Sequence, residues 1–290
     1  MTTDPLTPAA RALCEALSAG FPRPEAGPEA LRAAARARLG AIPPTPSVSA
    51  HGVPVRVYEG PADPVVVFAH GGGWVLGDLD THDRLCRALA ARTRATVLSV
   101  DYRRAPEHRF PAAEDDVYTA LRWAAAAYPG HPLVLAGDSS GGGLAAAAAL
   151  RARDGGGPPV AAQLLLYPAL DHRLDRPSAR DFADGFFHTT AHMRWYWQQY
   201  LGPCGDPRAA SPGLAADLSR LPPALLLLAD CDPLRDEGLA HARRLSAAAV
   251  PTQVHLHTGM FHGFLAGAGL LPEADAALTT AAAWLAPLTG

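Results

Sequence analysis

The sequence predicts an α/β fold in which one mostly parallel, doubly wound central sheet is flanked by helices. Two observations support this prediction. From residue 53 onward, short apolar runs alternate with longer segments of helical spacing, and such alternation favours a single sheet. Several of the runs are continuously apolar, as expected for parallel strands buried on both faces. The length of 290 residues allows one large domain of this kind or two ordinary ones.

The expected elements follow one another in a regular order. Residues 7–19 and 29–39 have helical spacing, and the Phe21-Pro22-Arg23-Pro24 segment separates them because prolines break a helix. Residues 42–46 (Ile-Pro-Pro-Thr-Pro) form an extended linker in this interpretation. The expected strands are residues 53–58, 64–69, 95–100, 133–136, 161–167, 224–229 and 252–257, and the expected helices are 83–92, 113–127, 142–153, 234–249 and 273–285.

A long segment between residues 170 and 221 interrupts the alternation. It has no strand pattern and is rich in aromatic residues. A structureless loop of about fifty residues would be unusual, so we interpret the segment as an inserted helical subdomain. We expect residues 1–45 and 171–220 to form a helical cap over a core made of residues 46–170 and 221–290.

Composition and charge exclude several partners. The net charge of −3 provides no global field for nucleic acid or anionic lipid. No apolar run approaches the roughly 18–20 residues of a membrane span, and no basic or apolar leader segment is visible. Four widely spaced cysteines without a C-x-x-C pair predict free, buried thiols and a cytoplasmic location. All 25 basic residues are Arg, so no Lys can act as a base, Schiff-base partner or phosphate anchor.

The first chemical motif is Gly-Asp-Ser-Ser-Gly at residues 137–141. It follows an expected strand and opens an Ala-rich expected helix, which is the context that G-x-S-x-G requires to form a nucleophile elbow. There the tight turn strains the serine backbone and exposes Ser139 Oγ at the carboxyl edge of the sheet, near the positive end of a helix. Ser140 is a weaker candidate for the nucleophile because it lies one place off the centre of the motif.

The second motif is His-Gly-Gly-Gly-Trp at residues 70–74, directly after the expected strand 64–69. Three glycines there place bare backbone N–H groups at the same edge of the sheet. Acyl transfer needs such donors where a carbonyl oxygen becomes an oxyanion. A flexible turn or a phosphate loop would also be rich in glycine. However, G-x-G-x-x-G is absent, and a chain without Lys has no P-loop.

A serine nucleophile needs a general base and an acid that orients it. His255 and His257 alternate with apolar residues inside an expected strand. His262 lies in a loop just beyond that strand, which makes it the best-placed base. Asp230 and Asp232 both end the strand 224–229, and their positions alone do not choose between them; Asp232 could also cap the following helix. The chain order Ser, Asp, His is that of α/β-hydrolases.

Metal and acid–base alternatives are weaker. No H-E-x-x-H motif is present, and the pair His188 and His192 is more typical of residues facing solvent or a pocket than of zinc ligands. Glu107–His108 and Asp115–Asp116 are expected to be hydrogen-bonded loop and helix-start residues. We therefore expect no metal and no cofactor.

Four blocks together resemble the bacterial hormone-sensitive-lipase family (family IV) of carboxylic ester hydrolases, within the α/β-hydrolase fold. The blocks are residues 70–74 (HGGGW), 101–113 (DYRRAPEHRFPAA), 137–142 (GDSSGG) and 232–238 (DPLRDEG). The resemblance implies a serine carboxylesterase acting on small-molecule esters with short- to medium-chain acyl groups. It implies Ser139 as the nucleophile, Asp232 as the orienting acid and His262 as the base.

The resemblance also implies that the N–H groups of Gly72, Gly73 and Ser140 form the oxyanion hole, and that His70 shapes the glycine loop. It implies a cap built from the N-terminal helices and the insertion, and similar proteins form homodimers through the edge of the last strand. In the aromatic cap and beside the glycine loop, we expect a substrate pocket with the following lining residues: Trp74, Phe187 and Trp195.

Two residues depart from the family pattern. Ser140 stands where the family usually has Ala, and its hydroxyl is expected to affect the hole or a bound water. Arg104 replaces a Leu, which we interpret as a local surface change. The alternative functions are an amidase, lactonase or metabolite deacetylase with the same machinery, and a non-catalytic small-molecule-binding protein. The plant gibberellin receptors that resemble this family lack the triad histidine, whereas His262 is present here.

Overall fold

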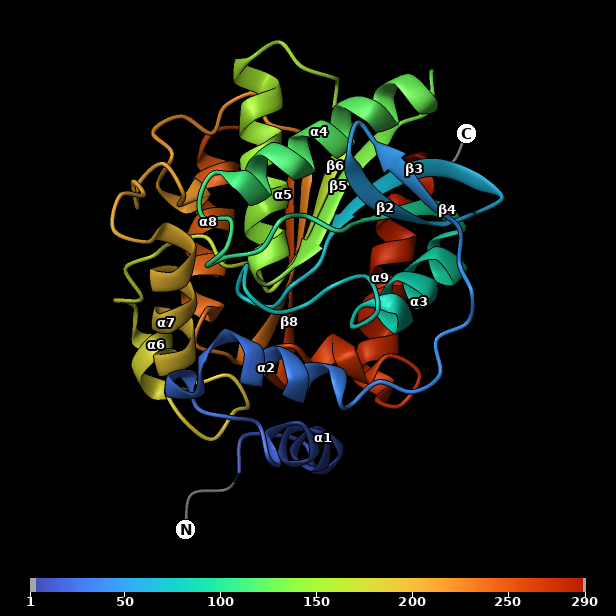
Figure 1. The fold of residues 1–290 in the computed structure, drawn as a ribbon. Helices are drawn as coiled ribbons and strands as arrows, with labels where there is room; N and C mark the ends of the chain where they lie inside the picture. The colour runs from blue at the N-terminus through green and yellow to red at the C-terminus, as the bar shows by residue number, and fades with distance from the viewer. Residues whose placement is uncertain (1–3, 289–290) are drawn as a thin grey trace.

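An eight-stranded sheet runs through the centre of the computed structural model, which describes residues 4–288 (Figure 1). Strands β3 to β8 are parallel to one another, and β1 and β2 are antiparallel strands at one edge of the sheet. The prediction of a mostly parallel sheet is confirmed. The strands, in the spatial order β1-β2-β4-β3-β5-β6-β7-β8, are β1 (Ser47–Ala50), β2 (Val53–Tyr58), β3 (Ala62–Ala69), β4 (Ala95–Val100), β5 (Leu133–Asp138), β6 (Ala162–Leu166), β7 (Ala224–Cys231) and β8 (Thr252–Phe261).

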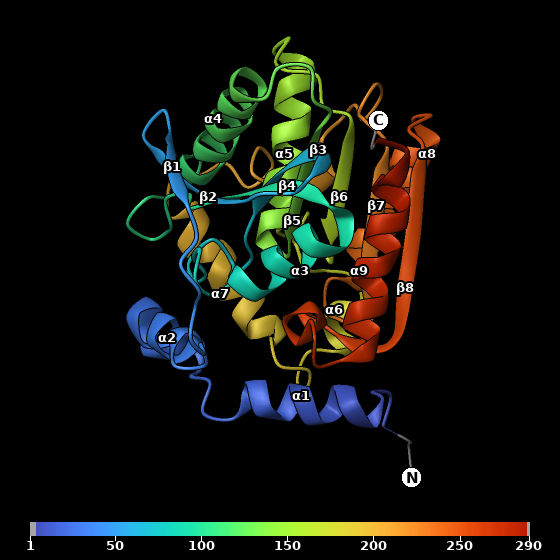
Figure 2. The ribbon, with the colours of Figure 1, turned by 90° about the vertical axis from the view of Figure 1, so that its right-hand side faces the viewer.

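Helices cover both faces of the sheet, as the alternation predicts. Helices α4, α5 and α8 pack on one face, and α3 and α9 pack side by side on the other (Figure 2). The helices are α1 (Pro8–Ser18), α2 (Gly27–Arg36), α3 (Asp83–Thr93), α4 (Ala112–Ala127), α5 (Ser140–Asp154), α6 (Pro177–Asp181), α7 (Thr190–Leu201), α8 (Arg235–Ala247) and α9 (Pro272–Leu285).

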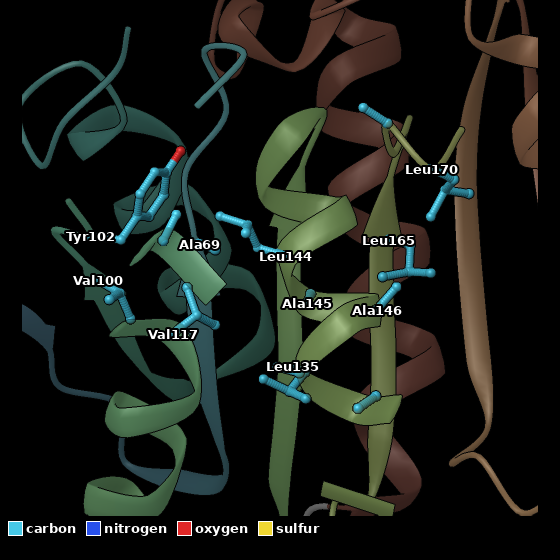
Figure 3. Close-up of a cluster of buried hydrophobic side chains, with 14 of the residues drawn as sticks. Ala69, Val100, Tyr102, Val117, Leu135, Leu144, Ala145, Ala146, Leu165 and Leu170 are labelled. Carbon is cyan, nitrogen blue, oxygen red and sulfur yellow. The ribbon is translucent and has the colours of Figure 1, made fainter. Parts of the chain in front are cut away.

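Strand β3 shows why the central strands are mostly apolar. Val65 and Val67 point into the core beneath α4 and α5, whereas Val66 and Phe68 point into the core beneath α3 and α9. Successive side chains of a strand alternate between faces, so a strand covered on both sides has few positions that favour a polar residue. Figure 3 shows the first of these cores, in which side chains of β5, β6 and α5 interdigitate.

Helices α1, α2, α6 and α7 lie together at one end of the sheet, where the parallel strands have their carboxyl ends (Figures 1 and 2). Residues 171–220 contain no strand, as expected. The two parts of this layer contact each other, because Nε2 of His192 in α7 lies 3.1 Å from the carbonyl oxygen of Pro22, which follows α1.

The sequence pattern misses one strand, β1, because three of its four residues are exposed and only Ala50 is buried. Strands β7 and β8 are also longer than expected, ending at Cys231 and Phe261. Three cysteines are buried free thiols, but Cys204 is exposed, contrary to expectation. None of the helices within residues 4–288 combines the length and the apolar character needed to cross a membrane.

Candidate active site

Ser139 occupies a sharp turn between β5 and α5. Its backbone has φ 53° and ψ −120°, a left-handed φ that strains any residue with a side chain. The turn requires glycine on both sides. A Cβ on Gly141 would lie 2.0 Å from the carbonyl oxygen of Ala69, and one on Gly137 would lie 2.3 Å from that of Gly141. These glycines therefore allow β3, β5 and α5 to approach closely enough to form the elbow.

Three side chains from separate loops form one continuous hydrogen-bonded line. Ser139 Oγ lies 2.8 Å from Nε2 of His262, and Nδ1 of His262 lies 2.8 Å from Oδ2 of Asp232. Asp232 follows β7 and His262 follows β8, so all three residues stand at the carboxyl edge of the sheet. Ser139 keeps 8% of its surface exposed, whereas His262 and Asp232 keep only 2% and 1%. The geometry is that of a nucleophile, a base and an orienting acid.

The competing candidates lie elsewhere. Asp230 points to Arg235, with 3.6 Å between the charged atoms, and does not contact His262. His255 and His257 belong to β8, as expected, and His255 is exposed on that strand. Asp232 is therefore the carboxylate that the structure brings to the imidazole of His262.

The glycine loop leaves backbone donors free next to the serine. In the described part of the chain, the N–H groups of Gly72, Gly73 and Ser140 donate to no protein acceptor. Gly72 and Gly73 have φ values of 112° and 61°, which favour glycine. A Cβ on Gly73 would lie 2.2 Å from Cγ of Tyr196, because the tyrosine ring packs directly on the loop. The loop can therefore present its amides only while it remains bare.

A buried polar network holds this loop in place, and of its members only His70 was predicted from the sequence to shape the loop. Nδ1 of His70 donates to the carbonyl of Gly71 across 2.9 Å, and the ring stacks on Tyr102, which donates to the His70 carbonyl. Burial lowers the pKa of His70 to about 3, so the ring is neutral. Asp138, the middle of the GDS sequence, accepts from the Gly71 amide across 2.8 Å and pairs with His82 at 3.3 Å.

Burial alone would raise the pKa of Asp138, but the adjacent His82 outweighs it and lowers that pKa. Burial alone would lower the pKa of His82, but the nearby Asp138 carboxylate favours the charged imidazole, and the pKa of His82 is raised. The pair therefore places a carboxylate beneath the first amide of the glycine loop. In the sequence, the only sign that Asp138 holds the glycine loop is its position within the Gly-Asp-Ser-Ser-Gly motif.

A cavity of about 450 Å³ opens above the serine. Of the three residues predicted to line a substrate pocket, Phe187 lines this cavity, whereas Trp74 and Trp195 do not. Trp74, which has φ 60°, is buried in the core, where its ring stacks on Tyr200 at 4.5 Å. The cavity wall also includes residues that the sequence did not predict as pocket residues, among them Leu13, Leu17, Phe21, Leu76, Tyr167, His188, Met193 and Tyr196.

The remaining candidates have structural partners. Glu107 pairs with Arg32 at 2.7 Å, and Asp116 pairs with Arg103 at 2.8 Å. Arg104 donates to the carbonyl of Gly77 across 2.6 Å, so it supports the loop after the glycines. Within residues 4–288 no group of His, Cys, Asp or Glu has the arrangement of a metal site.

Comparisons with known proteins identify the family of the chain. Residues 66–266 match the family model described as an alpha/beta hydrolase fold. The chain is 38% identical over 243 residues to an ethyl acetate hydrolase of Pseudomonas putida, covering 79% of this chain and 76% of that protein. It is 44% identical over 237 residues to the carboxylesterase NlhH of Mycobacterium tuberculosis, covering 77% and 74% of the two chains.

Solved structures show the same likeness over the whole length. A thermostable esterase from Pseudomonas putida superposes with a TM-score of 0.89 at 34% identity, covering 100% of this chain and 99% of that one. The match to the family model covers more than half of the chain, and the identity to bacterial carboxylic ester hydrolases extends over most of it. The chain therefore belongs to the α/β-hydrolase fold family, in the group of bacterial carboxylic ester hydrolases related to hormone-sensitive lipase.

Proposed function

We propose that the protein is a serine carboxylesterase that hydrolyses esters of short- to medium-chain acids with Ser139, His262 and Asp232. The observation that carries this proposal is the unbroken line from Asp232 through His262 to Ser139, which ends in a cavity beside three free amides. The names of the similar proteins support the same activity.

The acylation step uses each part of this arrangement. Ser139 Oγ attacks the ester carbonyl carbon while Nε2 of His262 takes the hydroxyl proton. The carbonyl oxygen becomes an oxyanion and accepts hydrogen bonds from Gly72, Gly73 and Ser140. Collapse of this intermediate breaks the bond to the alcohol oxygen, and His262 gives its proton to the departing alcohol. An acyl-enzyme on Ser139 remains.

Deacylation repeats the steps with water in place of the serine. Nε2 of His262 removes a proton from the water as its oxygen attacks the acyl carbonyl, and the same amides stabilise the second oxyanion. Collapse releases the carboxylic acid and returns the proton to Ser139 Oγ. Asp232 stays ionised and stabilises the imidazolium that forms twice per cycle.

The apolar side chains that the cap contributes to the cavity favour substrates with small apolar acyl groups. Residues 1–45 contribute Leu13, Leu17 and Phe21 to the cavity wall, and the inserted segment contributes Phe187 and Met193. A cavity of about 450 Å³ lies at the lower end of the range typical of small-molecule sites. We therefore propose that both cap segments set substrate size.

We also propose that two copies pair along β8. This strand is the last in the sheet, and its outer residues include the exposed apolar side chains Val254 and Leu256. An open apolar edge of this kind is a template for strand pairing. Light scattering should give twice the chain mass, and Leu256→Arg should return the monomer.

The proposed chemistry is tested by covalent labelling. A phosphonate ester should add its mass to the peptide that carries Ser139, and denaturation beforehand should prevent labelling. Ser139→Ala should abolish labelling and lower ester hydrolysis by several orders of magnitude, on the scale of about 10⁶-fold known for triad serines. Label on Ser140, or hydrolysis by Ser139→Ala within tenfold of the parent, would refute the assignment.

A panel of acyl esters graded by chain length, run beside a matched amide and a lactone, separates the esterase from its alternatives. We expect the highest kcat/KM for acetyl to hexanoyl esters. Faster hydrolysis of the amide or lactone would favour the alternative activities instead.

A further inference from the structure

The cavity wall contains an imidazole that the proposed chemistry does not use. His188 lies in the segment between α6 and α7, partly buried, and faces the cavity between Phe21 and Phe187, with its ring centre 5.6 and 4.2 Å from theirs. A polar ring in such surroundings loses hydration and needs a hydrogen-bond partner. Its position therefore suggests that something entering the cavity completes its hydrogen bonds.

The other histidine of the segment, His192, shows what a structural imidazole looks like here. Its Nδ1 lies 2.8 Å from Oγ1 of Thr189, and its Nε2 lies 3.1 Å from the carbonyl of Pro22. Both ring nitrogens are paired, and they hold the first turn of α7 and the chain after α1. His192 does not line the cavity above Ser139.

His188 has only one hydrogen bond to the described residues. Its Nδ1 lies 3.5 Å from the hydroxyl oxygen of Tyr196, and its Nε2 has no protein partner. No other described residue accepts from the Tyr196 hydroxyl, so the tyrosine is best paired when it donates to Nδ1. In that tautomer Nε2 carries the proton and is a free donor.

The ring is also uncharged. Burial lowers the pKa of His188 well below its ordinary value, and the nearby His262 and His192 act in the same direction. A neutral N–H group pairs with an ether, carbonyl or hydroxyl oxygen and offers no net charge to an anion.

The position of His188 identifies which half of the ester it meets. Its ring lies 6.0 Å from that of His262, centre to centre, in an edge-to-face arrangement. The departing alcohol must lie against His262, because Nε2 of His262 protonates its oxygen. The three oxyanion amides belong to the glycine loop and the elbow. His188 therefore borders the alcohol side of the site.

We propose that His188 is a specificity-determining residue, which donates from Nε2 to an acceptor oxygen on the alcohol part of the ester. This inference rests on the proposed esterase function and names a preference within it: esters of ether, hydroxy or keto alcohols over esters of plain alkanols. A plain alkyl chain would cover the N–H group without pairing it, and leaving a buried donor unpaired is unfavourable.

The test compares two esters that differ at a single position. In 2-methoxyethyl acetate an ether oxygen replaces one CH₂ group of n-butyl acetate, and the shapes of the two esters are otherwise nearly the same. The measured quantity is the ratio of kcat/KM for the ether ester to that for the butyl ester. His188→Leu should lower this ratio about three- to tenfold, the effect of one neutral hydrogen bond. The intrinsic difference in reactivity between the esters cancels, because both are run on each protein.

Two further variants make the result specific. His188→Gln keeps a side-chain N–H donor and should retain part of the ratio. His192→Gln changes the other imidazole of the segment and should keep the ratio of the unmodified protein. A ratio for His188→Leu within twofold of the parent, or an equal fall in His192→Gln, would overturn the role of His188. If the parent hydrolysed neither ester, the proposed function itself would fail.

Discussion

Asp232 makes two hydrogen bonds, one within its own segment and one to the imidazole. Its Oδ1 accepts from the backbone N–H of Leu234 across 2.7 Å, and its Oδ2 accepts from His262. The first bond closes a local turn before α8, but the N-cap residue of that helix is Leu234 and no side chain caps it, so the alternative that Asp232 caps the helix is not observed. The second is the bond that the proposed role of orienting acid requires. The first bond fixes the carboxylate so that only one oxygen faces the imidazole.

Asp232→Asn should therefore lower kcat severely while leaving the fold intact. An amide can still accept from Leu234, but its NH₂ group can favour the wrong tautomer of His262, an effect of about 10⁴-fold in serine proteases. The matched control is Asp230→Asn, which loses only a partly exposed ion pair and should change kcat less than about threefold. Steady-state hydrolysis of an activated acetate ester measures both. The opposite order of effects would move the acid to Asp230.

The residues of the site differ in how well the sequence predicts them. Ser139 and His262 follow from motif and position, because turn chemistry and strand ends are local properties. The pocket residues do not follow from the sequence, because which side chains of the predicted cap face the cavity depends on packing between segments that are distant in the chain. On α7, Met193 and Tyr196 line the cavity, whereas Trp195 does not. Trp74 follows the glycine loop directly, yet its ring stacks on Tyr200 in the core.

Among the elements, the predicted strands agree closely with the structure, and the central ones do so because they are short, mostly apolar runs that are buried on both faces. The exception is β1, whose exposed residues give no periodic signal; it exists because it pairs with β2. The glycine loop is a different kind of element, since its shape depends on contacts from distant segments. The Tyr196 ring covers Gly73, and Asp138 holds the Gly71 amide.

Gly73→Ala tests whether this loop must lack side chains. The new Cβ would lie 2.2 Å from Cγ of Tyr196, so the loop or α7 must move, and the amide of Gly73, a proposed oxyanion donor, moves with it. We expect kcat to fall about 10²–10³-fold, the effect of removing one such donor. Gly130→Ala is the matched control, because Gly130 also has a left-handed φ but nothing within 4 Å of its Cβ position.

The control should lose only about 1 kcal/mol of stability, from backbone strain, and keep its activity. Comparable activity in the two variants would show that the glycine loop tolerates a side chain. That result would remove Gly73 from the oxyanion hole.

At the scale of the whole molecule, an aromatic cluster joins α7 to the chain after the glycine loop and to the start of α4. Tyr200 of α7 stacks on Trp74 and meets Phe110 edge-to-face, and its hydroxyl lies 3.4 Å from Oε1 of Glu114 in α4. The sequence predicted that the inserted segment would be helical, but it did not predict this contact. The contact joins residues far apart in the chain and leaves a carboxyl group in a largely apolar setting.

Glu114 should make the stability of the whole protein depend on pH. Burial raises its pKa from 4.5 to about 7, although the Tyr200 hydroxyl acts in the opposite direction. Between these two values the folded chain binds more protons at this site than the unfolded chain, so the free energy of unfolding falls as the pH rises. The loss contributed by Glu114 should be about 2 kcal/mol between pH 5 and pH 8.

Glu114→Gln removes the titrating group while keeping the size of the side chain and an oxygen that can accept from Tyr200. The variant should resemble the parent at pH 5 and exceed it by about 2 kcal/mol at pH 8, because the parent alone pays for ionising a buried carboxyl group. Urea unfolding of both proteins at the two pH values measures this, and every other titrating group cancels in the difference. Equal stability of the two proteins at pH 8 would show that α7 and α4 meet around a carboxyl group that ionises as freely as in water.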